Sequence, residues 1–166
     1  MRRTNSFGAL ATIFIAGLLI PTAGRAQTVN PSEAQRLEQK AVSFRIDEFA
    51  KVADVLVKAA SLRSDTDPVG VGDLLQAAMA YYSGAKPDRA RQTFVQAADR
   101  ALAMGDVVRA ASGYLRAAII ANQQRDPERD ALIAKANRLA ASPLLTEPHR
   151  RAILGQFKQP IQVAEH

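Results

Sequence analysis

The stretch GDLLQAAMAYY at residues 72–82 returns 33 positions later as GDVVRAASGYL at residues 105–115. In both copies a Gly-Asp pair comes first, two adjacent alanines follow, and a tyrosine stands four residues after the first alanine. Residues four apart lie on one face of an α-helix, where alanine lets a neighbouring helix approach closely and tyrosine fills a wider gap. The repeated segment, with its first copy at 72–82 and its second at 105–115, therefore predicts helical hairpins that stack on one another.

Helix start and stop signals divide the rest of the chain, and no stretch alternates apolar and polar residues as a half-buried strand would. A first helix is predicted from Ser32, which forms a capping box with Gln35, to Leu62. Gly70-Val71-Gly72 is predicted to be a hinge at the end of the loop that follows. Five further helices are predicted from Asp73 to Gly84, from Pro87 to Gly105, from Asp106 to Gln124, from Asp126 to Ser142 and from Thr146 to Phe157. The predicted fold class is all-α, with about six helices that pair as three antiparallel hairpins.

The spacing of small and aromatic residues in both copies resembles the second helix of the tetratricopeptide repeat (TPR) family. The matching residues are Gly105, Ala110, Tyr114 and Ala117 in the second copy, and Gly72, Ala77 and Tyr81 in the first, where Gly84 takes the fourth place. Phe94 and Ala98 fit the large and small positions of the family's first helix. The resemblance covers one unit at 88–121 and half a unit at 72–86, and it implies a TPR-like α–α superhelix. A plain antiparallel helical bundle, with these alanines and tyrosines as its core, stays open as the alternative.

In the TPR family, ligands contact mostly the inner face of the first helix of each unit. The resemblance therefore implies that Gln92, Val95 and Asp99 are the binding residues of this chain. One TPR subtype holds a C-terminal carboxylate with Lys and Asn. The matching positions here are Val95 and Asp99, so that ligand is not implied.

The N-terminal residues have the pattern of a secretory signal peptide. Arg2 and Arg3 precede an apolar run that ends at Pro21, and Gly24-Arg25-Ala26 offers small residues for cleavage after Ala26. The run is shorter than the roughly 20 residues that span a bilayer, although an uncleaved anchor is the alternative. We therefore expect a signal peptide at 1–26, one TPR-like helical domain at 27–158, a disordered tail at 159–166, and a periplasmic or secreted location.

The charge and cysteine content narrow the class of partner. The full chain has 22 basic and 16 acidic residues, but three arginines would leave with the signal peptide, which lowers the net charge from +6 to +3. Much of the basic character thus belongs to the signal, and we expect no nucleic-acid partner. The chain contains no cysteine, so it uses no disulfide and has no lipid-anchor site. No stable membrane insertion is expected after signal cleavage.

No group of residues matches a known catalytic or metal-binding pattern. The two histidines, His149 and His166, have no carboxylates or thiols at ligand spacing, and no nucleophile motif is present. We expect no enzyme activity, no metal and no cofactor. Tyr81 and Tyr114 are predicted to lie in the core, whereas Tyr82 is predicted to face outward.

The sequence favours an exported helical scaffold that binds another envelope protein or a peptide, and it predicts no particular oligomeric state. The alternative is a bundle that uses its basic surface to bind an anionic partner, or that associates with itself. Basic residues form two groups: Arg89, Arg91 and Arg100, and then Arg125, Arg129, Lys135 and Arg138. Acidic residues lie between them, which is typical of a mixed, solvated surface.

Overall fold

The computed structural model of the chain describes residues 29–45 and 47–158. These residues form seven α-helices and no strand. The helices are α1 (Pro31–Val42), α2 (Phe49–Ser61), α3 (Pro68–Ser83), α4 (Pro87–Ala103), α5 (Val107–Gln123), α6 (Arg129–Ala140) and α7 (Glu147–Lys158). The predicted all-α fold of stacked helices is confirmed, with one helix more than predicted. The predicted signal peptide at 1–26 and the predicted tail at 159–166 lie outside the described residues.

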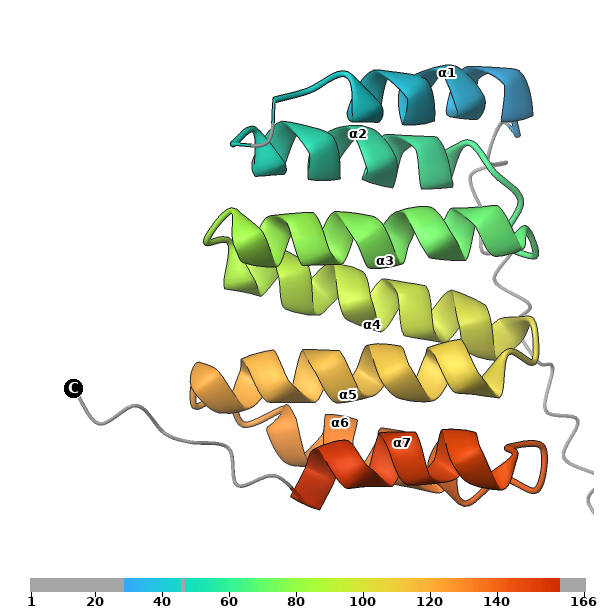
Figure 1. Cartoon of the computed structure of the whole chain (residues 1–166), viewed down its shortest axis with the longest axis vertical. Helices are drawn as coiled ribbons and strands as arrows, with labels where there is room; N and C mark the ends of the chain where they lie inside the picture. The colour runs from blue at the N-terminus through green and yellow to red at the C-terminus, as the bar shows by residue number, and fades with distance from the viewer. Residues whose placement is uncertain (1–28, 46, 159–166) are drawn as a thin grey trace, which may run out of the picture.

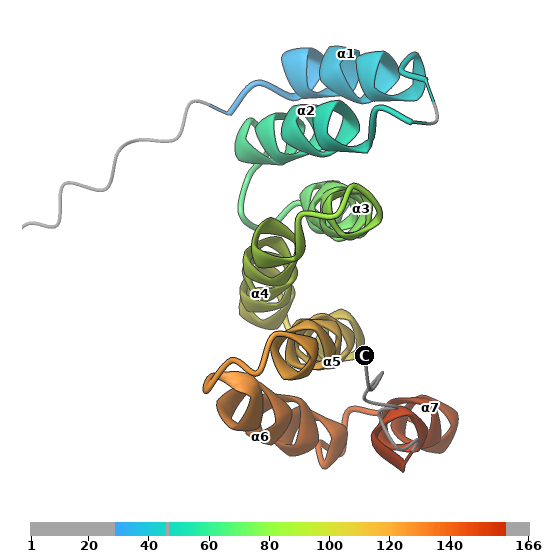
Figure 2. The same cartoon turned by 90° about the vertical axis from the view of Figure 1, so that its left-hand side faces the viewer.

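The helices stack along the long axis of the molecule, and consecutive helices run in opposite directions (Figure 1). Viewed from the side, α2, α4 and α6 form one layer and α3, α5 and α7 form the other (Figure 2). The most extensive packing joins neighbours in the chain from α1 to α6, whereas α7 contacts α5 and α6 only lightly. The chain therefore zigzags between two layers, and each layer presents one broad face of the molecule.

The single helix predicted from Ser32 to Leu62 is wrong, because the structure divides it into α1 and α2. The backbone N–H of Ser43 donates to the carbonyl of Lys40 at 3.1 Å and closes the end of α1. The carboxylate of Glu48 then accepts a hydrogen bond from the backbone of an arginine three residues earlier, which stabilises the turn before α2. The turn lets α1 fold back antiparallel onto α2 (Figure 1).

The predicted start of the first helix is also wrong, since α1 is capped by Asn30 and not by Ser32. The Asn30 side-chain oxygen accepts a hydrogen bond from the backbone N–H of Glu33 at 3.1 Å. Pro31 follows the cap at the first helical position, where its missing N–H costs nothing. An Asn cap followed by Pro is therefore a stronger start than the Ser-Gln capping box two residues later.

The predicted start of α3 at Asp73 is also wrong, because this helix begins at Pro68. The Asp67 side chain accepts a hydrogen bond from the backbone N–H of Val69 at 2.9 Å and caps the helix. Pro68 again takes the first position, so cap and proline together start the helix before the chain reaches the glycines. Gly70-Val71-Gly72 is therefore not a hinge but part of the first two turns of α3.

The second copy of the repeated segment behaves as predicted. Gly105 has a φ of +77°, a left-handed conformation that glycine adopts without strain, and it separates α4 from α5. The Asp106 carboxylate accepts a hydrogen bond from the backbone N–H of Arg109 at 3.0 Å and caps α5. The predicted start of α4 at Pro87 is also confirmed.

The last two helices lie close to their predicted places. Helix α6 begins at Arg129 instead of Asp126, because the Asp126 carboxylate accepts the backbone N–H of Glu128 at 2.8 Å and holds a turn ahead of the helix. Helix α7 differs by one residue at each end from the predicted helix at 146–157. His149 is exposed on it.

The core is built mainly from alanine, with a few large side chains in the wider gaps. Tyr81 and Tyr114 are buried as predicted, and Phe94 lies between them in chain order on α4. Gly113 marks the closest approach of α4 and α5: a Cβ atom placed there would lie 2.9 Å from the Cβ of Ala98. Small residues therefore set the spacing of the helices, and the tyrosines fill the remaining space.

Candidate functional site

The three binding residues predicted from the sequence lie together on the layer of α2 and α4. Gln92, Val95 and Asp99 share a hollow of about 370 Å³, which we call the α2–α4 hollow. Its other lining residues are Ser61, Asp65, Gln96 and Arg100. The helical spacing of the three predicted residues thus places them on one side of α4.

The charged groups of the α2–α4 hollow are already engaged within the chain. Arg100 donates to the Asp65 carboxylate at 2.6 and 2.9 Å and to backbone carbonyls at the end of α2, including that of Ala60 at 2.9 Å. The Asp99 carboxylate accepts a hydrogen bond from the hydroxyl of Tyr114. A ligand at this hollow would have to compete with these contacts, which leaves mainly the amides of Gln92 and Gln96 for recognition.

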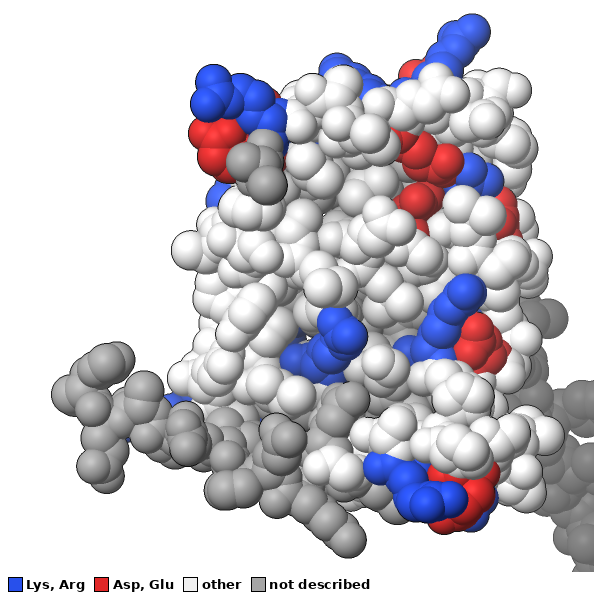
Figure 3. All heavy atoms as spheres, in the orientation of Figure 1, with Lys and Arg blue, Asp and Glu red and all other residues white. Residues whose placement is uncertain are grey.

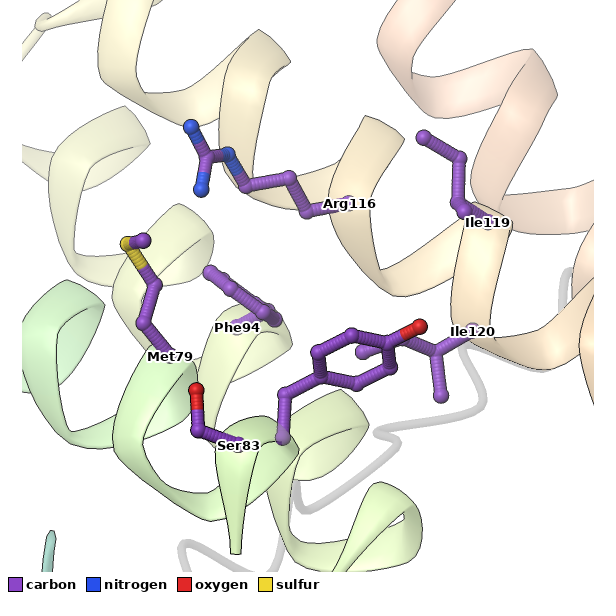
Figure 4. Close-up of a pocket in the computed structure, with 7 residues that line it drawn as sticks. Met79, Ser83, Phe94, Arg116, Ile119 and Ile120 are labelled. Atoms are coloured by element: carbon purple, nitrogen blue, oxygen red, sulfur yellow. The ribbon is translucent and has the colours of Figure 1, made fainter. Parts of the chain in front are cut away.

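A second hollow, of about 200 Å³, opens on the opposite layer between α3 and α5. This α3–α5 hollow is lined by Met79, Tyr82, Ser83, Phe94, Arg116, Ile119 and Ile120 (Figure 4). Phe94 and Ile120 are almost fully buried and form its floor, whereas Met79 and Tyr82 are 52% and 46% exposed at its rim. Large apolar side chains therefore border open space here, although their burial would be favourable.

Among the described residues, Arg116 is the only charged one that lines the α3–α5 hollow. Its guanidinium carbon lies 5.8 Å from the centre of the Phe94 ring, within reach of a cation–π interaction. In the part of the chain that the structure describes, its guanidinium forms no ion pair and donates no hydrogen bond to a carboxylate. The reason is local: α5 contains no acidic residue, and the only acid of α3, Asp73, is buried.

The surface around the α3–α5 hollow carries few charges. Figure 3 shows a mostly uncharged surface over α3, with basic side chains at the level of α5, one of them beside an acidic group. The hydroxyl of Tyr82 donates to the side-chain oxygen of Gln123 at 3.1 Å, which links the ends of α3 and α5 across the rim. Tyr82 faces outward, as predicted. An apolar rim with one unpaired cation is a surface that a partner with complementary charge could cover.

The first group of basic residues is neutralised by acids from other helices. Arg89 lies 3.1 Å from a carboxylate oxygen of Asp54, and Arg91 lies 3.2 Å from one of Asp126. Arg100 bridges to the loop after α2, as described above. These pairs leave little free positive charge on α4.

The second group of basic residues is more varied. Arg129 pairs with the adjacent Asp130, and the ammonium of Lys135 lies 4.9 Å from the centre of the Tyr114 ring. Within the described part of the chain, Arg125 and Arg138 have no carboxylate partner. The group is therefore not a continuous basic patch.

A buried ionic cluster joins α1, α2 and α3. Arg63, 9% exposed, donates to the carboxylate of Glu38 at 2.9 Å and to that of Asp67 at 2.9 Å, and its Nε lies 3.5 Å from Asp73. Burial raises the pKa of Asp73 to about 7, and the negative charge of Glu38 adds to this effect. Three carboxylates around one arginine hold the first three helices together, so this cluster has a structural role.

Neither a metal-binding type of cluster nor a membrane-spanning helix is found among the described residues. No three His, Cys, Asp or Glu side chains in this part of the chain are grouped in a way that could hold a metal ion. None of the described helices is both long enough and apolar enough to cross a lipid bilayer.

Sequence reasoning missed the α3–α5 hollow, although part of its signal is present in the sequence. Both α3 and α5 lack an acidic residue on their exposed faces, while Met79 and Arg116 stand there among small side chains. The pattern gains meaning only when α3 and α5 are known to lie in the same layer. Comparison of the chain with protein-family models, with curated proteins and with solved structures gives no match in any of the three.

Proposed function

We propose that the protein is an exported, non-enzymatic helical scaffold of the cell envelope that binds another protein or a peptide. The observation that carries this proposal is the α3–α5 hollow, where exposed Met79 and Tyr82 stand beside the unpaired Arg116. Exposed apolar side chains next to an unpaired charge are typical of an interaction surface. The signal-like residues 1–26 and the TPR-like spacing support the same function from the sequence.

The two hollows compete as the binding face, and the geometry favours the one between α3 and α5. In the α2–α4 hollow, Arg100 and Asp99 already have partners within the chain. In the α3–α5 hollow, Arg116 has no carboxylate partner among the described residues, and Met79 and Tyr82 are half exposed at the rim. A partner would therefore displace fewer existing interactions from the α3–α5 layer than from the other one.

The alternative function, binding of an anionic partner through a general basic surface, has weaker support. Arg89, Arg91 and Arg100 each pair with a carboxylate of another segment. Such pairs reduce the positive field that would attract a polyanion. The two functions differ in their response to salt, because contact through screened surface charges is lost at moderate ionic strength, whereas burial of apolar groups is not.

Site-specific photo-crosslinking in intact cells tests the proposed function. A photoreactive amino acid replaces Met79 on one layer or Gln92 on the other, and Arg138 on α6 serves as the control position. We expect Met79 to give a defined crosslinked protein that Arg138 does not give, and signal cleavage after Ala26 to be found by mass spectrometry of the exported chain. Crosslinks only from Gln92 would move the binding face to the α2–α4 layer. The absence of crosslinks from both Met79 and Gln92 would overturn the scaffold function.

A further inference from the structure

The α3–α5 hollow has the size of a site for protruding side chains and not for an enclosed small molecule. Its volume is about 200 Å³, whereas sites for small ligands typically have roughly 300–1,000 Å³. It opens between α3 and α5, and Phe94 on α4 lines it from behind (Figure 4). Helix α4 lies in the other layer, beside α3 and α5 (Figure 2). A groove between two helices over a third is the geometry that receives an amphipathic helix in helix-in-groove complexes.

The charge of the groove determines what kind of helix fits it. Arg116 would be partly buried under any partner, and a guanidinium that loses water without gaining an anion is costly. No carboxylate is available to it on α3 or α5. The partner must therefore supply one, while the apolar floor of Phe94 and Ile120 requires large apolar side chains beside it.

Resting on the proposed function, we infer that the α3–α5 hollow binds an acidic amphipathic helix of another protein. Its apolar side chains lie on Phe94, Ile119 and Ile120, and one of its carboxylates pairs with Arg116. Met79 and Tyr82 close over the apolar face of this helix from the rim, where they are half exposed in the free protein. The cation–π contact between Arg116 and Phe94 holds the guanidinium over the floor, ready for a bidentate pair with the carboxylate.

Two fluorescent model peptides test the charge of the partner. One is a short amphipathic helix with leucines on one face and glutamates on the other, and the second has lysines in place of the glutamates. Binding to the purified protein is measured by fluorescence anisotropy. We expect the acidic peptide to bind about 10-fold or more tightly than the lysine peptide, which corresponds to one well-formed charge pair. Failure of the acidic peptide to bind, or equal binding of both, would overturn the inference.

Charge exchange then locates the contact. Arg116→Glu should weaken binding of the acidic peptide about 10-fold or more and should strengthen binding of the lysine peptide. Arg138→Glu is the matched control: it makes the same change in net charge at an exposed arginine of α6 that has no carboxylate partner among the described residues. Equal losses in the two variants would show a general charge effect and contradict a site at Arg116. Met79→Ser should weaken binding of the acidic peptide about 3-fold or more through lost apolar contact, without changing the preference for acid.

Two other occupants would overturn the inference of a separate partner. Residues 159–166 follow α7 and contain Ile161, Val163 and Glu165, so the chain itself has apolar and acidic side chains of the required kind. If Ile161→Asp makes the acidic peptide bind 10-fold more tightly, the chain's own segment is the occupant. If Arg116→Glu turns a dimer in sedimentation analysis into a monomer, the occupant is a second copy.

The peptide experiments and the crosslinking experiment can fail separately. A crosslinked partner from position 79 whose capture is unchanged by Arg116→Glu would refute the acidic helix and leave the scaffold function standing. Acidic peptide binding that depends on Arg116, without a crosslinked protein in cells, would support the chemistry of the groove and refute the scaffold function.

Discussion

The two copies of the repeated segment share their residues but not their place in the fold. In the second copy, Gly105 makes the turn between two helices and Asp106 caps the next one. In the first copy, Gly72 lies inside α3, and Asp73 is buried beside Arg63. The same local sequence thus opens a helix in one case and continues a helix in the other.

The difference arises upstream of each copy. Ahead of Gly72, Asp67 and Pro68 provide a cap and a proline at the first helical position, so α3 is already formed when the chain reaches the glycine. Ahead of Gly105, α4 is still running and ends only at Ala103, so no earlier start competes with Asp106. A capping signal therefore works only where no stronger signal precedes it.

The tyrosines show where the two copies remain alike. Tyr81 and Tyr114 are both buried, and both hydroxyls donate to a carboxylate of the preceding helix in the other layer, Asp54 and Asp99 respectively. Burial and the neighbouring negative charge raise the pKa of both tyrosines. Packing thus gives the tyrosine the same buried, hydrogen-bonded role in both copies, even though the helix start differs.

The largest expected effect on stability is at Tyr114, the buried tyrosine of the second copy. Tyr114→Ala should lower the free energy of unfolding by about 3–5 kcal/mol, because it removes a buried aromatic side chain and leaves a cavity. Tyr82→Ala, at the half-exposed rim, should change it by less than about 0.5 kcal/mol. Urea unfolding followed by circular dichroism measures both. A loss below about 0.5 kcal/mol for Tyr114→Ala would remove this residue from the core.

A smaller effect is expected where the copies differ by one methyl group. The second copy has Gly113 at the position of Ala80 in the first. A Cβ atom at Gly113 would lie 3.0 Å from the carbonyl oxygen of Phe94 and even closer to Ala98, so α4 and α5 would have to move apart. Gly113→Ala should therefore cost about 1–3 kcal/mol by overpacking. If this substitution stabilised the protein, the close approach of the two helices would be refuted.

Asp73, the aspartate of the first copy, should make the free energy of unfolding depend on pH. The pKa of Asp73 is raised to about 7 in the folded protein, compared with about 3.9 in an unfolded chain, so folding takes up a proton between these values. Stability should then fall as the pH rises from about 4 to about 7, by no more than about 1.4 kcal/mol per pH unit. Thermal melts across this range measure the slope.

Asp73→Asn provides the control for the pH experiment, because it removes the titrating group and should flatten the slope. Asp106→Asn should keep the wild-type slope, since this residue caps a helix at the surface and asparagine also caps well. A wild-type slope in Asp73→Asn would contradict the assignment of the pH dependence to the buried cluster.

The smallest effect gives the sharpest test, since the two glycines should respond with opposite sign. Gly72→Ala should stabilise the protein by about 0.5–1 kcal/mol, because the position is inside a helix and no atom of a neighbouring residue would lie within 4 Å of the new Cβ. Gly105→Ala should destabilise it by about 1 kcal/mol, because φ is +77° there. Calorimetric melting temperatures measure both, and equal signs would mean that the two copies share one backbone conformation.

The sequence predicted the helical class and the central hairpin well. Pro87, Gly105 and Asp106 fix the ends of α4 and α5 through the fixed φ of proline, the left-handed freedom of glycine and the side-chain cap of aspartate. These are local effects, so they can be recognised without the rest of the molecule. The break between α1 and α2 could not be recognised in this way, because no proline or glycine marks it. The break is favoured because Glu38 on α1 can contact Arg63 after α2 once α1 has folded back onto α2.

The candidate sites, too, could be predicted from the sequence only in part. The resemblance to the TPR family pointed to Gln92, Val95 and Asp99, whose helical spacing puts them on one side of α4, and the structure finds them around one hollow. That spacing could not show that Asp99 is engaged by Tyr114 from α5. Nor could it show that Met79 and Arg116, from different hairpins, border the same opening.

The sequence by itself determined that this chain forms short antiparallel helices, with alanines where they approach and tyrosines where they separate. Periodicity, caps and turns act over a few residues, so they are written directly in the order of amino acids. Only the tertiary structure decided which carboxylates surround Arg63, and that Met79 and Arg116 border the same hollow. These outcomes depend on side chains from helices far apart in the chain, whose contacts and charges count only after the layers have stacked.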